Sequence, residues 1–360
     1  MPETIDEQIT IEKTKDPKEI PADDDLDFGR LFSDHMFMME YESGKGWHDP
    51  QIMPYQPLEI DPGSSFCHYC QVTFEGMKAY RNEDDEIMLF RPGKNAERLN
   101  NSNRRMCMPE LDPEFFIEAV KTLVDVDSDW VPSSEGTSLY IRPLMIATEK
   151  YLGLKSSDSY KFLIIASPVG SYYPEGLKPT EIKVETEYVR SVKGGTGAAK
   201  TGGNYGRSLL AQNQAAEDGF DGVLWLDGRE RKYVEEVGAM NVFFRIDDTI
   251  VTPSLEGTIL PGITRDSVIK ILEDRGEEVE ERKLEIEELA QAYRNGYLQE
   301  AFGTGTAAVI APIGRIQWED LNMEINDREV GPLTSEIYDI LTGIQRGRIE
   351  DEYGWTVKVK

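Results

Sequence analysis

The spacing of hydrophobic residues predicts both helices and strands in this chain. Between residues 113 and 126, apolar side chains recur at the i, i+3, i+4, i+7 spacing of one helix face, and Asp112 ahead of Pro113 is typical of a helix start. The same pattern predicts helices over 95–105, 209–218, 264–275, 286–295 and 333–345. Short β-forming runs predict strands over 36–41, 65–74, 78–81, 87–90, 137–142, 161–167, 182–192, 222–226, 241–245 and 300–308. The polar turn at 82–85 makes the strands beside it an antiparallel hairpin.

A stretch rich in proline and glycine divides the chain. Residues 168–179 hold three prolines and two glycines, which is typical of a connector between domains. Strands and helices mix on both sides of it without a strict βαβ alternation, so we expect two α+β domains. The predicted organisation is an acidic, flexible tail over 1–25, a smaller N-terminal domain over 26–168, an interdomain loop over 169–181 and a larger C-terminal domain over 182–360.

Composition and charge exclude several classes of protein. Hydrophobic residues make up 39% of the 360 residues, enough to bury a core, so global disorder is excluded. The formal net charge of −28 makes nucleic acid and anionic membranes poor partners. We find neither an apolar run long enough to cross a bilayer nor a secretory signal. With only three cysteines, we expect a cytoplasmic protein without a disulfide framework.

The cysteines and histidines leave little room for a metal site. Cys67 and Cys70 form a C-x-x-C pair, which could be a thiol redox centre or half of a zinc site. The chain has no second such pair, and the segment is predicted to be a strand. We therefore expect no metal site and interpret the two thiols as structural.

The most unusual segment is rich in glycine and carries a single lysine. Residues 194–206 contain six glycines and two alanines around Lys200, and such small residues let a bound group approach the backbone closely. A flexible surface loop is one interpretation, although several polar side chains would then be expected.

A phosphate-binding P-loop is a second interpretation of this segment. Lys200 and Thr201 fit the end of that motif, and Asp227 follows an apolar strand as its metal-binding aspartate would. A P-loop requires a helix that begins at the Lys-Thr pair, and the glycines at 202, 203 and 206 disfavour one.

A Schiff-base lysine is the third interpretation. A lysine in a confined site can become nucleophilic and form an imine with a carbonyl cofactor. Pyridoxal phosphate would also need donors for its phosphate, a carboxylate for its ring nitrogen and a donor to its phenolic oxygen. The sequence can supply all three.

Six motifs in order resemble those of the branched-chain amino acid aminotransferases, which are pyridoxal-phosphate enzymes of fold type IV. They are FEGMKAYR (74–81), SLYIRP (138–143), KTGGNYG (200–206), EEVGAMN (235–241), LPGITR (260–265) and FGTGTA (302–307). The resemblance runs from about residue 28 to the C-terminus. It implies an α+β fold with a smaller N-terminal α/β domain, a larger C-terminal domain with a β-barrel-like core, and the cofactor at their interface.

The resemblance implies a role for each residue that matches a family position. Lys200 corresponds to the lysine that binds pyridoxal 5'-phosphate and moves the proton, and Glu236 to the acid that faces the ring nitrogen. Tyr205 corresponds to the tyrosine on the phenolic oxygen. The phosphate would be bound by Arg98, Ile263, Thr264 and Thr306.

The substrate side is implied to be mostly apolar, with a charge at its edge. The matching wall residues are Phe28, Tyr69, Phe74, Tyr140 and Tyr172. The α-carboxylate would be bound by Tyr69 and the amides of Ala239 and Ala307, and the distal carboxylate of glutamate by Arg142. Leu154 matches a loop position that reaches in from a partner subunit, so a homodimer is implied.

The implied activity is reversible transfer of the amino group of leucine, isoleucine or valine to 2-oxoglutarate. Within the same fold type, the alternatives are a D-amino acid aminotransferase and an aminodeoxychorismate lyase, which the SLYIRP and EEVGAMN segments disfavour. A P-loop nucleotide hydrolase and a non-catalytic acidic binding protein are the alternatives from other classes.

Overall fold

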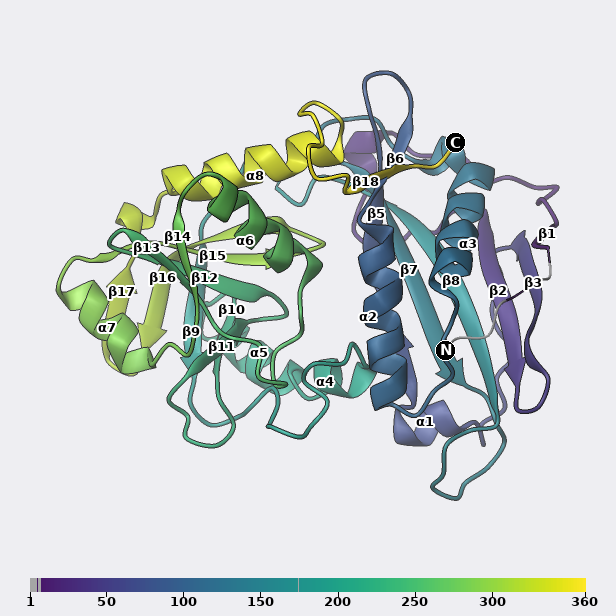
Figure 1. The fold of residues 1–360 in the computed structure, drawn as a ribbon, viewed down its shortest axis with the longest axis horizontal. Helices are drawn as coiled ribbons and strands as arrows, with labels where there is room; N and C mark the ends of the chain where they lie inside the picture. The colour runs from purple at the N-terminus through teal and green to yellow at the C-terminus, as the bar shows by residue number, and fades with distance from the viewer. Residues whose placement is uncertain (1–4, 6–7, 174) are drawn as a thin grey trace. The chain divides into compact units, whose positions relative to one another are not determined.

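The computed structural model describes Ile5, residues 8–173 and residues 175–360, and the chain forms two compact units (Figure 1). Unit 1 takes the chain up to residue 174 together with Ala199–Gly202 and Gly343–Lys360. Unit 2 takes Glu175–Ala198 and Gly203–Thr342. Unit 1 therefore consists of three chain segments, and the middle segment is four residues long and contains Lys200.

Unit 1 is built on a nine-stranded sheet. Its strands follow the order β1-β3-β2-β8-β7-β5-β6-β18, and β4 pairs with β7 outside this path. All pairs are antiparallel except β1 with β3. The strands are β1 (Thr10–Ile11), β2 (His35–Glu42), β3 (Gly46–Pro54), β4 (Val72–Phe74), β5 (Met77–Arg81), β6 (Ile87–Phe90), β7 (Ser138–Ala147), β8 (Ser159–Val169) and β18 (Thr356–Lys358).

Helices α2 (Pro92–Arg105) and α3 (Pro113–Val126) cover one face of this sheet (Figure 1). The four α3 positions with helical spacing, from Phe116 to Leu123, are all fully buried, and they pack with Phe37 of β2 and Phe162 of β8 in one core. The Asp112 carboxylate accepts the Glu114 backbone N–H and caps α3 as predicted. Burial of each large apolar side chain stabilises the packing of this helix on the sheet by about 2 kcal/mol.

Unit 2 also contains a nine-stranded sheet, with mixed strand directions. The order is β11-β10-β9-β16-β15-β12-β13-β14, with β17 beside β16. Strand β9 is parallel to both of its neighbours, and β14 is parallel to β13. The strands are β9 (Thr180–Glu185), β10 (Gly222–Leu226), β11 (Val234–Val237), β12 (Asn241–Ile246), β13 (Thr249–Thr252), β14 (Glu278–Glu281), β15 (Leu298–Gly305), β16 (Val309–Trp318) and β17 (Leu321–Glu324).

The helices of unit 2 pack on this sheet through small and branched apolar residues. Ala211 and Ala215 of α5 lie against Trp225, and Leu289 and Ala290 of α7 join the larger core. The helices are α4 (Gly202–Gly206), α5 (Leu209–Glu217), α6 (Ile263–Asp274), α7 (Ile286–Arg294) and α8 (Pro332–Gln345), the last of which leads back into unit 1. The two mixed sheets with helices on them confirm the predicted α+β fold.

Two expectations for unit 1 differ from the structure. The tail expected to be flexible over 1–25 contains strand β1, and its residues Lys18 and Asp23 bond to Phe32 and Ser133–Ser134. Residues 65–74 are not one strand but helix α1 (Ser65–Tyr69) followed by β4. Cys70 ends α1 with φ 51°, a left-handed conformation that breaks the strand pattern.

Two further segments differ from expectation. Strand β9 ends at Glu185 rather than at residue 192, because the Glu185 carboxylate accepts the backbone N–H groups of Glu187 and Tyr188 and turns the chain. The glycines after Thr201 form the single-turn helix α4, which the sequence disfavoured. The expected C-terminal domain also differs from unit 2, because β18 pairs with β6 in unit 1.

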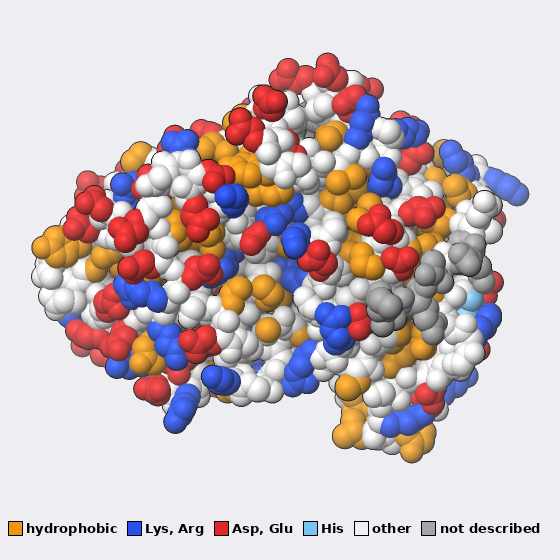
Figure 2. Space-filling model, viewed as in Figure 1, with side chains coloured by type: hydrophobic (Ala, Val, Ile, Leu, Met, Phe, Trp, Pro, Cys, Tyr) orange, Lys and Arg blue, Asp and Glu red, His pale blue; other side chains and the backbone are white. Residues whose placement is uncertain are grey.

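Acidic side chains are spread over the face shown in Figure 2, with basic side chains among them, so the charge of −28 forms no single patch there. Among the described residues, no helix is both long and apolar enough to cross a membrane.

Candidate active site

Lys200 is held in place through its backbone in unit 1. Its N–H donates to the Ser102 hydroxyl on α2 at 2.8 Å, and its carbonyl accepts the Phe74 N–H at 3.1 Å. Thr201 pairs with Thr73 of β4, and its hydroxyl donates to the Val72 carbonyl. The glycine-rich segment is thus attached to a sheet edge at the lysine, and the Lys200 Nζ lies 4.9 Å from the centre of the Phe74 ring.

Arg98 is buried on α2 in a two-bond ion pair. Its Nε and Nη2 donate to the two carboxylate oxygens of Glu75 at 2.8 and 2.7 Å. Asn95 donates to the same carboxylate, and Glu75 is fully buried. The guanidinium orientation is therefore fixed before any ligand arrives. No role was predicted for Glu75 from the sequence, although it lies in the FEGMKAYR motif.

Four of the predicted substrate residues lie together in unit 1. The Arg142 guanidinium lies 4.9 Å from the ring of Phe74 and 5.3 Å from that of Tyr140, and its Nη2 donates to the Tyr140 hydroxyl at 3.0 Å. The Phe28 ring packs edge-on against Tyr140 at 5.1 Å. Gly76 makes room for this arrangement, because a Cβ there would collide with the Tyr140 hydroxyl. Lys200 faces the same Phe74 ring, so one aromatic group joins the lysine to the arginine.

The other predicted substrate residues of unit 1 are not in this cluster. Tyr69 ends α1, and its hydroxyl donates to the carbonyl of Leu152. Leu154 follows in the same loop and is 83% exposed. Tyr172 is 54% exposed and contacts Tyr173.

Glu236 lies on β11 of unit 2 and is 2% exposed. Its Oε2 is 2.5 Å from the Nε of Arg190, itself buried, and Arg190 also donates to the carbonyl of Thr258 at 3.0 Å. No role was predicted for Arg190 from the sequence, because it lies in none of the six motifs.

Asn241 connects the predicted cofactor residues of unit 2. Its side-chain amide donates to Glu236 Oε1 at 3.2 Å and to the Leu260 carbonyl at 3.0 Å. Across the ladder it faces Thr304 of β15, two residues before Thr306. Its oxygen lies over Gly262, where a Cβ would collide with it. This buried amide belongs to the EEVGAMN motif but had been given no role.

The start of α6 carries two of the residues predicted to bind the phosphate. The helix begins at Ile263, and Gly262 caps it without a side-chain bond. Thr264 is nearly buried in the first turn. Backbone N–H groups at such a helix start suit an anion. Asn241 thus lies between these amides and Glu236.

The loops that carry Ala239, Thr306 and Ala307 meet at β15. Met240, next to Ala239, packs against Gly303 and Gly305, where side chains would be crowded. Thr306 and Ala307 follow β15 directly in the turn before β16. Unit 2 therefore contains Glu236, the start of α6 and both alanines.

Tyr205 lies on α4 and is half-buried, and its neighbour Asn204 bonds to Thr196.

The features that suggested a P-loop have structural roles. The Asp227 carboxylate accepts four backbone N–H groups, from Arg229, Glu230, Lys232 and Tyr233. Burial acts to raise the pKa of Asp227, but these four donors outweigh it and hold the pKa below its usual value. Within the described part of the chain, no three acidic, histidine or cysteine side chains gather as metal ligands.

Comparisons with known proteins show the family of this chain. The family described as "Amino-transferase class IV" matches residues 73–316. "Branched-chain-amino-acid aminotransferase 2" of Bacillus subtilis is 57% identical over 98% of this chain and 96% of its own length. "Branched-chain-amino-acid aminotransferase" of Mycolicibacterium smegmatis is 48% identical over 92% of both chains.

Solved structures show the same fold. The branched-chain amino acid aminotransferase of Escherichia coli has a TM-score of 0.76 at 27% identity, covering 91% of this chain and 99% of its own. The branched-chain amino acid aminotransferase from Thermobaculum terrenum, solved in its PLP-form, has a TM-score of 0.74 at 25% identity, covering 90% and 98%. This chain belongs to the class IV aminotransferase family, and within it to the branched-chain-amino-acid aminotransferases.

Proposed function

We propose that this chain transfers the amino group of leucine, isoleucine or valine to 2-oxoglutarate, with pyridoxal 5'-phosphate bound to Lys200. The observation that carries the proposal is the backbone attachment of Lys200 to Ser102 and Phe74, which presents one lysine from a glycine-rich segment. When bound, the cofactor supplies an aldehyde for the amino group and an electron-withdrawing ring for the Cα–H bond.

The residues of unit 2 fit the ring and phosphate of this cofactor. Glu236 would keep the ring nitrogen protonated, and Arg190 and Asn241 fix the position of its carboxylate. The amides of Ile263 and Thr264 and the Thr306 hydroxyl would bind the phosphate, and the family resemblance assigns the Arg98 guanidinium of unit 1 to the same group. Tyr205 would donate to the phenolic oxygen.

Lys200 would act as base and acid, moving a proton between the substrate Cα and the cofactor. Phe74 covers the lysine with an apolar ring and would help to exclude water. Such exclusion strengthens the electrostatic contacts in the site.

The aromatic cluster of unit 1 fits substrates of two kinds. Phe28, Phe74 and Tyr140 offer apolar surface to a branched side chain. Arg142 adds a charge, and its buried Nε has no hydrogen-bond partner among the described residues. A distal carboxylate of glutamate or 2-oxoglutarate would supply that acceptor, so one pocket could serve both substrates. Tyr69, Tyr172 and the amides of Ala239 and Ala307 would complete the binding of the α-carboxylate and the apolar wall.

We also propose a homodimer that acts in the cytoplasm. Leu152 and Leu154 are 68% and 83% exposed on one loop, and such apolar exposure suits burial against a second copy. All three cysteines are free, which fits a reducing compartment.

The test is a visible absorbance spectrum of the purified protein incubated with pyridoxal phosphate. The proposal expects a yellow band that bleaches when leucine is added and returns when 2-oxoglutarate is added. Lys200→Ala should lack this behaviour. Lys183→Ala, which removes a surface lysine paired with Asp218, is the matched control and should retain it. A protein that stays colourless with added cofactor would refute the proposal.

A further inference from the structure

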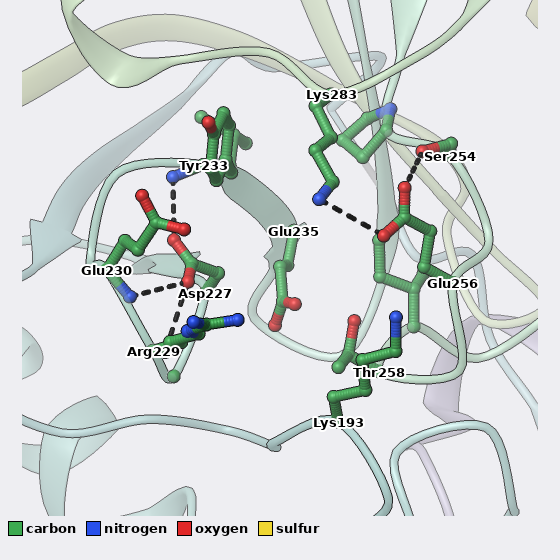
Figure 3. A pocket seen from close by; sticks show the side chains of 14 residues that line it. Lys193, Asp227, Arg229, Glu230, Tyr233, Glu235, Ser254, Glu256, Thr258 and Lys283 are labelled. Atoms are coloured by element: carbon green, nitrogen blue, oxygen red, sulfur yellow. Dashed lines mark hydrogen bonds and ion pairs between the residues drawn. The ribbon is translucent and has the colours of Figure 1, made fainter.

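Unit 2 contains a cavity that the proposed reaction does not use (Figure 3). It measures about 140 Å³ and lies between the Asp227–Glu235 segment and the loop before α6. Its wall includes Glu235, Thr258, Lys193, Arg229, Lys283 and Glu256. Glu235 and Glu236 are consecutive on β11, so their side chains point to opposite faces of the strand. The cavity therefore lies on the face away from Glu236.

Glu235 brings an unsatisfied acceptor to this cavity. Its side chain projects into the middle of the lining residues in Figure 3, yet the residue is only 6% exposed. Its Oε2 is buried and has no hydrogen-bond partner among the described residues. Burial raises the pKa of Glu235, against the lowering effect of the Thr258 hydroxyl; Asp227 raises it further, and Arg190 lowers it. A buried oxygen without a donor is costly, and a bound donor would relieve that cost.

Two cations without carboxylate partners line the same cavity. Lys283 is paired with Glu256 at 3.1 Å, and the Asp227 carboxylate is occupied by backbone N–H groups. In the described part of the chain, the side chains of Lys193 and Arg229 form neither a hydrogen bond nor an ion pair. Both are exposed at the cavity. Glu230 also lines the cavity and carries a negative charge, so an anionic group is favoured beside Lys193 and Arg229 and not across the whole cavity.

We propose that this cavity binds a small zwitterion of the amino-acid class, with its ammonium on Glu235 and its carboxylate facing Lys193 and Arg229. Such a molecule satisfies the buried acceptor and both cations without bringing net charge into the cavity. The volume is about that of five waters, which suits a short aliphatic amino acid. A lone anion would leave the Glu235 oxygen unpaired, and a lone amine would leave the two cations unpaired.

The test is isothermal titration calorimetry on the full chain with β-alanine, which carries both charges on a short spacer. Propionate and propylamine carry one charge each and serve as paired probes. We expect β-alanine to bind at least tenfold more tightly than either. Glycine and 4-aminobutyrate then vary the distance between the charges. Equal or tighter binding of propionate would mean a simple anion site and would overturn the proposal.

Variants locate the binding within the chain. Glu235→Gln keeps the shape but removes the charge, and we expect it to weaken β-alanine binding about tenfold or more. Arg229→Gln and Lys193→Gln, which change exposed residues, should each weaken β-alanine binding severalfold. These two variants test the proposal if Glu235→Gln does not fold. Lys183→Gln removes a positive charge on the surface of unit 2, away from the cavity, and should have no effect. Binding that survives all three cavity substitutions would place the zwitterion elsewhere and refute the proposal. The readout is heat, so the outcome does not depend on transaminase activity.

Discussion

Both units contain a buried arginine–glutamate pair, and the residue proposed to touch the cofactor is the arginine in one pair and the glutamate in the other. In unit 1, Arg98 is the residue proposed to touch the cofactor, and Glu75 positions it through both carboxylate oxygens. In unit 2, Glu236 is proposed to touch the cofactor, and Arg190 positions it. In both cases the family resemblance assigned a role to the member proposed to touch the cofactor and none to the member that positions it.

The two pairs also differ in how they are supported. Glu75 serves Arg98 and Asn95 together, so several donors depend on one carboxylate. Arg190 has a second acceptor in the Thr258 carbonyl, and Glu236 has a second donor in Asn241. Stability should therefore depend more on the pair in unit 1, and catalysis more on the pair in unit 2.

The largest stability effect is expected from Glu75→Ala. It removes the carboxylate from a buried guanidinium and from Asn95, and we expect the free energy of unfolding to fall by about 3–5 kcal/mol. Urea unfolding measures it. Glu97→Ala removes the partner of exposed Lys94 on the same helix and should cost less than about 1 kcal/mol. Equal costs for the two variants would show that burial of the pair is not decisive.

Glu236→Ala should cost less stability than Glu75→Ala but more catalytic activity. We expect it to cost about 2–3 kcal/mol of stability, less than Glu75→Ala, because Arg190 keeps a carbonyl acceptor. Its loss of kcat should be larger than that of Glu75→Ala, on the order of 10²–10⁴-fold, since it removes the carboxylate proposed to keep the ring nitrogen protonated. Steady-state kinetics with added cofactor measures this, and Glu236→Asp should recover part of the rate. A fully active Glu236→Ala would refute the role assigned to this carboxylate.

Arg142→Gln should separate the two substrates. The KM for 2-oxoglutarate should rise about 10- to 100-fold, or about 1.4–2.8 kcal/mol, because the distal carboxylate loses its cation. The KM for leucine should change less than about threefold. Arg104→Gln, on the exposed side of α2, is the control. A parallel rise for both substrates would indicate a general packing role for Arg142 instead.

The smallest effect is expected from Glu235→Gln, as a change in pH dependence. Burial raises the pKa of Glu235 above its ordinary value of 4.5, so between those two values the folded state holds a proton that the unfolded state has lost. Stability from this group is therefore complete below pH 4.5 and is lost as pH rises through the folded pKa. As pH rises, the free energy of unfolding of Glu235→Gln should therefore increase relative to that of the unmodified chain. The increase should be about 1.4 kcal/mol for each pH unit between the unfolded and the folded pKa of Glu235. Urea unfolding from about pH 4 to about pH 8 would show it, and a constant difference would mean that this carboxyl does not titrate anomalously.

Segments with a clear apolar pattern were predictable from sequence. Helix α3 lies over the predicted residues because it buries one regular set of apolar side chains, and strand β10 does as well because all five of its residues are buried. The short segments were not predictable. Helix α1 has five residues, too few to be stable alone, and it is held by bonds from Ser65 and Tyr69 to a loop more than eighty residues away.

Polar edge segments were missed for a related reason. Strand β14, with the sequence EVEE, has no alternation of apolar residues and is a strand because it pairs with β13. What makes this segment a strand is its backbone hydrogen bonding to β13, which the types of its own side chains do not reveal. No periodicity argument could have found it.

The sequence by itself determined the α+β class, the long core elements and the family, and it named a lysine, an arginine, a tyrosine and a glutamate for the chemistry. These follow from local patterns and from motifs read along the chain. Only the tertiary structure revealed Glu75, Arg190 and Asn241, the two-bond pairing of Arg98, and the cavity at Glu235. Each depends on contacts between residues that lie apart along the chain or on how completely a side chain is buried. Hydrogen bonding and desolvation depend on which groups are close in space, and closeness in space cannot be read from positions along the chain.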